Sequence, residues 1–179
     1  MAVKDIAQLF AYGLLAIAAT VGGAAAQTIG ALSATEIERA LSDAGYSPKV
    51  LEDSSAPNQT SGNPLFGGTT FLSGGTTIVF YVRTAGCTGD PAACENLIFY
   101  ANFDLNRDVT PDDFRSANGF NDAQVFGRAY ILEADKLVGI DYTIDLGGGV
   151  TREHLAKGLT RWPDVVQKFI DAFSAANSQ

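Results

Sequence analysis

Cys87 and Cys94 are the two cysteines of this 179-residue chain, and their spacing limits the chemistry open to them. Six residues lie between them, so they do not form a C-x-x-C motif, and no second pair of soft ligands completes a zinc site. In an exported chain the spacing favours a disulfide across a hairpin loop over a metal clip or a redox pair. In the loop-entropy model, closing so short a loop contributes roughly 2.5 kcal/mol to stability.

The segment 104–108, with the sequence DLNRD, begins like a calcium-binding loop. It places oxygen ligands at the first, third and fifth positions, as such loops require. The pattern then fails, because Val109 stands where a Gly is needed and Arg115 where a Glu should complete the shell. Thr110 followed by Pro111 predicts the start of a helix instead. No metal site is predicted.

Asp141 and Asp145 fall on one face of a predicted strand, where paired carboxylates would suggest acid and base catalysis. Their backbones should lie about 13 Å apart, whereas glycosidase pairs need about 5–9.5 Å. We interpret both as part of the solvated face of the sheet. His154, the only histidine, falls in the first turn of a predicted helix, which favours an exposed residue. The glycine-rich segment 147–151 lacks the phosphate-binding motifs, so no catalytic or cofactor-binding residue is predicted.

The elements that position these residues are mostly strands. From Leu137 to Leu146 apolar residues alternate with polar or small ones, which predicts a half-buried strand. The run 125–133 favours strand too, and the short polar link 134–136 predicts an antiparallel hairpin. Two apolar, aromatic-rich runs, 76–83 and 96–105, predict central strands.

Helices and loops complete the predicted domain. Ser33 to Gly45 carries a capping box and a closing glycine, and Thr151 is expected to cap another helix after the glycine-rich turn. A last helix is expected to start at Pro163, with Trp162 before it in the core. Two further segments are a short edge strand at 46–52 and a loop from Ser54 to Gly68, in which Asn58-Gln59-Thr60 matches a glycosylation sequon.

The first 26 residues predict a signal peptide. An uncharged apolar stretch from Ile6 to Val21 is followed by Ala24-Ala25-Ala26, so cleavage is expected after Ala26, giving a periplasmic or secreted chain. An uncleaved membrane anchor is the alternative, although a span needs roughly 20 apolar residues. Residues 27–179 suit a single domain with no stable membrane insertion. The formal net charge of −8 argues against nucleic acid as a partner.

Two segments, FNDAQVFGRAYI at 120–131 and DYTIDLGGGVTREHL at 141–155, resemble the YbjN-like family of bacterial proteins. The resemblance covers roughly Leu32 to Phe173. Gly119 departs from it, because a larger helix-forming residue is expected there, and the 54–68 loop is longer than usual. The matched residues are Asn118, Phe120, Asn121, Phe126, Gly127, Arg128, Ala129, Tyr130, Asp145, Gly148, Gly149, Val150, Thr151, Trp162 and Phe173.

The resemblance implies a fold and a class of function. The fold is α+β, a single domain with a mainly antiparallel sheet of five or six strands and helices packed on it, similar to the type III secretion chaperones. Members are described as bacterial regulators of sensory transduction, without catalytic residues. This implies a non-enzymatic regulatory or protein-binding module whose partner is another protein, with no cofactor, and the predicted signal peptide makes it an exported one. An unrecognised enzyme and a periplasmic small-ligand-binding protein remain alternatives, and a homodimer is open.

The most specific matched residues gather where a helix is followed by a strand. The candidate interaction surface is Asn118, Phe120, Asn121, Arg128 and Tyr130. A structural role explains many of these residues, because Asn can satisfy backbone groups at a helix end, Gly127 can let a helix approach the sheet, and Phe126 with Tyr130 can fill the core. Arg128 is explained least, since its guanidinium needs a carboxylate partner or solvent.

Overall fold

The structure, a computed structural model, describes residues 28–51 and 63–176. The predicted signal peptide, Met1 to Ala26, lies outside the described residues, and so does the sequon at Asn58. Both stay predictions.

One antiparallel sheet dominates the described part, with seven strands, and a two-stranded sheet stands beside it. In the large sheet the order is β3-β4-β5-β6-β8-β7, with β2 paired to the start of β6, while β1 pairs with β9. The strands are β1 Thr28–Ile29, β2 Leu32–Ser33, β3 Lys49–Leu51, β4 Leu65–Phe71, β5 Thr77–Thr88, β6 Ala93–Asp104, β7 Arg128–Leu132, β8 Leu137–Asp145 and β9 Val150–Thr151.

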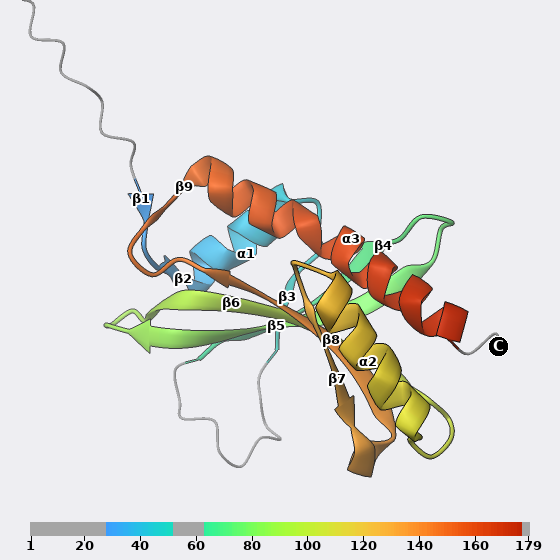
Figure 1. Ribbon diagram of the computed structural model, residues 1–179. Helices are drawn as coiled ribbons and strands as arrows, with labels where there is room; N and C mark the ends of the chain where they lie inside the picture. The colour runs from blue at the N-terminus through green and yellow to red at the C-terminus, as the bar shows by residue number, and fades with distance from the viewer. Residues whose placement is uncertain (1–27, 52–62, 177–179) are drawn as a thin grey trace, which may run out of the picture.

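Three helices of the described part lie on the same side of this sheet (Figure 1): α1 Ala34–Asp43, α2 Pro111–Ala123 and α3 Arg152–Ala176. The core fills the space between them. Trp162 is fully buried, with its ring centroid 5.6 Å from that of Phe99 and 5.7 Å from that of Phe80. The predicted α+β single domain is therefore confirmed, and so is Trp162 as a core residue. The sheet exceeds five or six strands because the two-residue β2 joins it and β4 was not expected.

The predicted loop from Ser54 to Gly68 is wrong at its end, because Leu65 to Gly68 belong to β4. Phe66 is 1% exposed and anchors this strand in the core. Gly67 and Gly68 suggested a loop, yet an added Cβ would stand 3.2 Å from Leu51 Cδ1 and 2.9 Å from Phe80 Cζ. Neighbouring side chains therefore cover both glycines so closely that a residue with a Cβ would not fit there without a shift.

Side-chain caps fix the starts of the helices as the sequence predicts. Glu36 Oε2 accepts hydrogen bonds from Ser33 N at 2.8 Å and Ser33 Oγ at 2.7 Å, which is the predicted capping box of α1. At α2, Asp113 Oδ2 accepts from Thr110 N and Oγ1, both at 2.8 Å. Thr151 Oγ1 accepts from the backbone N–H of His154 at the start of α3.

The prediction that a separate helix starts at Pro163 is wrong, because Pro163 lies inside α3. A proline inside a helix has no N–H for the carbonyl four residues earlier, here that of Leu159. That carbonyl instead accepts a hydrogen bond from the hydroxyl of Tyr46, at 2.6 Å, and the bond is buried. The helix continues through Pro163 because a side chain from outside the helix supplies the missing donor.

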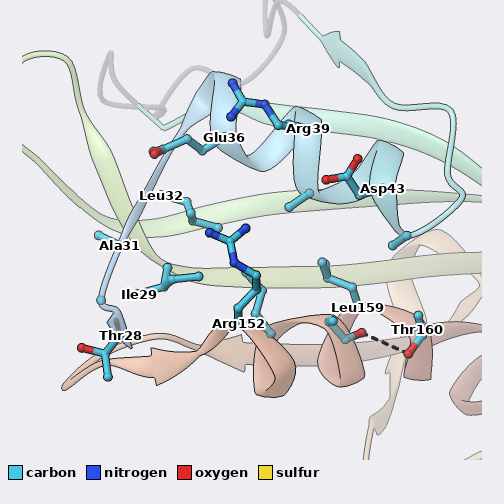
Figure 2. A pocket seen from close by; sticks show the side chains of 15 residues that line it. Thr28, Ile29, Ala31, Leu32, Glu36, Arg39, Asp43, Arg152, Leu159 and Thr160 are labelled. Carbon is cyan, nitrogen blue, oxygen red and sulfur yellow. Dashed lines mark hydrogen bonds between the residues drawn. The ribbon is translucent and has the colours of Figure 1, made fainter. Parts of the chain in front are cut away.

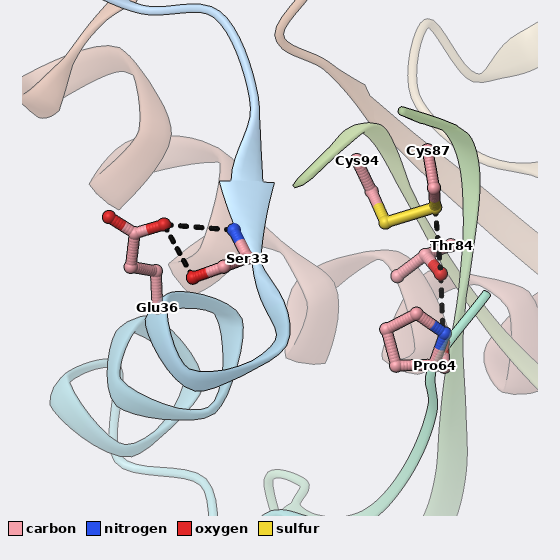
Figure 3. Close-up of a disulfide and its surroundings, with 6 residues drawn as sticks. All are labelled: Ser33, Glu36, Pro64, Thr84, Cys87 and Cys94. Carbon is pink, nitrogen blue, oxygen red and sulfur yellow. Dashed lines mark hydrogen bonds between the residues drawn. A yellow bond between two sulfur atoms is a disulfide. The ribbon is translucent and has the colours of Figure 1, made fainter. Parts of the chain in front are cut away.

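The predicted disulfide is present between Cys87 and Cys94, which face each other across the β5–β6 hairpin. Figure 3 shows the bridge beside Thr84, whose hydroxyl donates to the carbonyl of Pro64 at 2.9 Å. The bond joins the ends of two 12-residue strands and so fixes their register close to the hairpin loop.

Gly119, which departs from the family pattern, sits inside α2 with open space around it. An added Cβ there would meet no atom within 4 Å. Gly119→Ala should therefore raise the free energy of unfolding by about 0.5–1 kcal/mol, because Ala loses less backbone entropy in a helix. Urea denaturation measures this. Gly158→Ala in α3 is the control, since its Cβ would stand 3.0 Å from Ile144 Cδ1; equal gains at both positions would contradict the explanation.

Candidate functional site

The face of the large sheet that points away from the three helices carries the candidate site. We call it the open face, because in Figure 1 no helix of the described part lies on it. Side chains alternate between the two faces along each strand. The central residues of the open face are Val79, Tyr81, Arg83, Ile98, Tyr100, Asn102, Arg128, Tyr130, Asp141 and Thr143.

Strand register sets four of these residues in one row across the sheet. Tyr81 pairs with Tyr100, Tyr100 with Asp141, and Asp141 with Arg128. The two tyrosine rings stack, with centroids 5.4 Å apart and planes at 28°. The row therefore runs from an aromatic pair to a charged pair without leaving the open face.

Arg128 has its carboxylate partner within the chain. Its Nη2 and Nε donate to the two carboxylate oxygens of Asp141. This hydrogen bond and the charge of Asp141 raise the pKa of Arg128. Asp141 lies on the open face, as predicted, but is only 9% exposed, whereas Asp145 is exposed as expected. The Arg128 side chain keeps 68% of its surface exposed, which leaves it accessible from the open face.

Tyr130 lies flat against the open face rather than in the core, so its predicted core role is wrong. The reason is Gly139, its partner on β8, because any Cβ there would overlap the tyrosine ring. The hydroxyl of Tyr130 donates to Asn102 Oδ1 at 2.6 Å. Burial, with the charge of Asp141, raises the pKa of Tyr130 to about 12, so the hydroxyl keeps its proton at neutral pH.

Two shallow hollows of about 410 and 500 Å³ lie on the open face. They share Arg83, Arg128 and Asp141. Arg83 is exposed and makes no ion pair with any residue that the structure describes, unlike Arg128. Nothing in the sequence marks Arg83 as a site residue, although its spacing of two from Tyr81 predicts that both lie on one face of a strand.

The other predicted surface residues do not join the open face. Phe120 is 3% exposed in the core, and Asn118 is exposed on α2. Asn121 has the structural role expected of an Asn near a helix end. Its amide nitrogen donates to the carbonyl of Ala129 at 3.0 Å, and its Oδ1 accepts from the Ala129 N–H at 2.7 Å. The predicted surface is thus divided, and Arg128 with Tyr130 belongs to the candidate site.

Gly127 allows α3 to approach the sheet, as predicted, because an added Cβ would stand 2.6 Å from Val165 Cγ1. The expectation that Phe126 fills the core is wrong, since it is 46% exposed. The guanidinium carbon of Arg161 lies 3.8 Å from the centroid of the Phe126 ring, a cation–π contact. Phe126 therefore forms a rim at the edge of the smaller hollow.

Neither a metal cluster nor a membrane span is found in residues 28–51 and 63–176. No group of three or more His, Cys, Asp or Glu side chains there is placed to hold a metal ion. No helix in the same ranges has the length and apolar character needed to cross a membrane. His154 is exposed, as the sequence predicts.

Comparison with known proteins gives one match. The model of the YbjN family, described as "Putative bacterial sensory transduction regulator", matches residues 33–175. No curated protein and no solved structure matches the chain, so the similarity to type III secretion chaperones stays a prediction. The family match includes α1, α2, the whole of β3 to β9, and α3 except for its last residue. The chain therefore belongs to the YbjN family.

Proposed function

We propose that this chain is an exported, non-enzymatic regulatory module that binds another protein, and that its open face receives an acidic segment of that partner. The observation that carries the proposal is Arg83, a guanidinium shared by two hollows and without a carboxylate in the described part of the chain. The planar fork of an arginine suits a carboxylate, which it binds through two parallel hydrogen bonds.

Charge complementarity at Arg83 supports an acidic partner. By strand register Lys49, Arg83 and Arg128 lie on the open face, and so do Asp104, Asp141 and Asp145. Asp141 neutralises Arg128, whereas Arg83 has no ion pair among the described residues. A carboxylate of the partner would therefore find its complement at Arg83 itself.

The aromatic residues supply contact area. Tyr81 is 36% and Val79 is 57% exposed, and both lie on the same face of β5 as Arg83. Tyrosines suit protein recognition because they offer a large, rigid, amphipathic surface at a low cost in side-chain entropy. An extended segment that alternates acidic and apolar residues would match the arginine and the tyrosines together.

Two further observations favour a binding module outside the cytoplasm. The pKa of the described Asp113 lies far below its ordinary value, because its carboxylate binds Arg107 and caps α2. This shift belongs to a group that stabilises the fold. Asp113 lines neither hollow, so the shift gives no sign of catalysis on the open face. The disulfide between Cys87 and Cys94 fits the oxidising compartment that the predicted signal peptide implies.

The test compares two charge reversals, Arg83→Glu on the open face and Arg115→Glu on α2. Both arginines are exposed, so neither change should reduce stability much. The probes are a synthetic peptide that alternates glutamate with leucine or phenylalanine, and its lysine counterpart. We expect the acidic peptide to shift the amide resonances of β5, β6 and β7. Affinity should fall at least tenfold in Arg83→Glu, stay unchanged in Arg115→Glu, and weaken as salt is added.

Arg128→Ala is a poorer test, because it leaves the nearly buried Asp141 without its ion-pair partner. The proposal fails if Arg83→Glu binds the acidic peptide as tightly as the parent, or if the lysine peptide binds better. Resonance shifts confined to the helices would also place the binding surface elsewhere.

A further inference from the structure

A groove of about 570 Å³ separates α1 from α3, with Thr28 to Leu32 closing one end. Figure 2 shows it from close by, with α3 along one wall and α1 along the other. Its volume falls within the range of small-molecule sites, roughly 300–1,000 Å³. None of the residues that line it lines either hollow of the open face. The groove is therefore a separate site.

Apolar side chains form much of the groove. Leu32 comes from β2, Ala40 from α1, and Leu155 with Leu159 from α3. Ile29 of β1 lies at the same end as Leu32, as Figure 2 shows. An aliphatic chain lying here would leave water and contact these side chains, which is favourable in proportion to the apolar area covered.

Arg152 gives the groove a charged end. It is the first residue of α3, is exposed, and in Figure 2 its guanidinium extends from α3 toward Leu32. It has no ion pair among residues 28–51 and 63–176. In the same helix Lys157 has a partner, because its Nζ lies 2.8 Å from Glu153 Oε1. Arg152 is thus a cation available to a ligand.

The other charges of the groove lie on α1, and they define which anion fits. Glu36 accepts two hydrogen bonds from Ser33, which, with the charge of Arg39, lower its pKa, so its carboxylate is ionised and already engaged at the helix cap. Asp43 is the last residue of α1 and is exposed, and Figure 2 shows it on the α1 wall, across the groove from α3. A ligand with one carboxylate on Arg152 and an uncharged chain would pair with the cation of α3 and leave the α1 carboxylates to solvent.

We infer that this groove binds a small amphipathic carboxylate, such as a medium-chain fatty acid, with the carboxylate on Arg152 and the chain along the apolar floor. The arginine fork pairs with both carboxylate oxygens. The chain contributes through apolar burial, so affinity increases with length until the groove is full, by up to roughly fourfold for each methylene that is fully buried.

Isothermal titration of the purified protein with octanoate, decanoate and decylamine tests the inference. Decanoate should bind more tightly than octanoate, and decylamine should not bind. Arg152→Gln should weaken decanoate at least tenfold, while Lys157→Gln, which removes a charge from the exposed side of the same helix, should leave it unchanged. Ala156→Phe should block binding, because Ala156 is an exposed residue of the groove. Thermal unfolding verifies that each variant is folded.

Four results would overturn the inference. The first is no binding of decanoate by the folded parent, and the second is equal affinity in Arg152→Gln. The third is a preference for decylamine that Asp43→Asn abolishes, which would make the groove a site for amines. A dimer that Ala156→Phe dissociates, without decanoate binding, would assign the groove to a second copy of the chain and would also exclude the carboxylate.

Discussion

Tyr46→Phe is expected to lower the free energy of unfolding by about 1–3 kcal/mol, although it removes a single oxygen. Without the hydroxyl, the buried carbonyl of Leu159 has neither Tyr46 nor a helical N–H, because Pro163 occupies the position that would donate. The ring itself should stay in place, with its centroid 5.1 Å from that of Phe80. Burial raises the pKa of Tyr46, so the hydroxyl remains a donor at neutral pH.

A double-mutant cycle isolates this effect. Pro163→Ala restores an N–H four residues after Leu159, so in that background Tyr46→Phe should cost at least about 1 kcal/mol less. Denaturation curves of the parent, both single variants and the double variant give the coupling energy. If Tyr46→Phe costs the same with Pro163 and with Ala at that position, the hydroxyl does not compensate for the proline.

Asp113→Asn should destabilise the protein by about 2–3 kcal/mol. The Asp113 side chain is 3% exposed, and its carboxylate accepts hydrogen bonds from both terminal nitrogens of Arg107 and from the backbone and hydroxyl of Thr110. Asn retains one acceptor oxygen, but its amide N–H group would face the donors of Arg107 and Thr110, with which it cannot form hydrogen bonds. The loss of stability is smaller than for a fully buried ion pair, because the Arg107 side chain is 39% exposed and can be solvated in the variant.

Asp112→Asn is the matched control, because Asp112 is adjacent in the sequence, has the same charge, and is 80% exposed. Its exposed ion pair with Arg115 is expected to contribute less than about 1 kcal/mol. Guanidinium denaturation of both variants at neutral pH measures the difference. Equal losses would mean that helix charge, rather than the buried network of Asp113, stabilises the start of α2.

The Asp113 network also predicts a pH dependence. Its hydrogen bond with Arg107, then those with Thr110, hold the pKa of Asp113 far below its ordinary value, against the opposing effect of burial. The stabilising contribution is complete above the unfolded pKa, about 4, and falls as pH drops below it toward the folded pKa. The stability difference between the parent and Asp113→Asn should therefore shrink below pH 4 and stay constant between pH 6 and 8.

Local signals in the sequence predict local structure well. Ser33 with Glu36 identified the start of α1, and the alternation from Leu137 to Leu146 identified β8. The prediction at Pro163 is wrong because the donor that compensates for the proline comes from Tyr46, which is 113 positions before its acceptor Leu159. A rule that depends on neighbours in sequence cannot include such a partner.

The candidate site also combines features that sequence spacing predicts with features that depend on the three-dimensional structure. Arg128 was singled out because a guanidinium on a sheet needs a carboxylate, and the strand register then placed it opposite Asp141. The importance of Arg83 depends on what surrounds it in three dimensions, since two hollows meet there and no described carboxylate forms an ion pair with it. Sequence spacing predicts the face on which a residue lies. It does not predict which cation on that face remains unpaired.

The pairing of Asn121 with Ala129 has a consequence for how copies of this protein can associate. β7 is the last strand of the large sheet, and the outer edge of such a strand offers free N–H and C=O groups to any extended chain. The Asn121 amide occupies both groups of Ala129, as a neighbouring strand would. A fibril or a dimer that extends the sheet across β7 would first have to displace Asn121. Self-association in which two sheets join edge to edge at β7 is therefore opposed by a single side chain of α2.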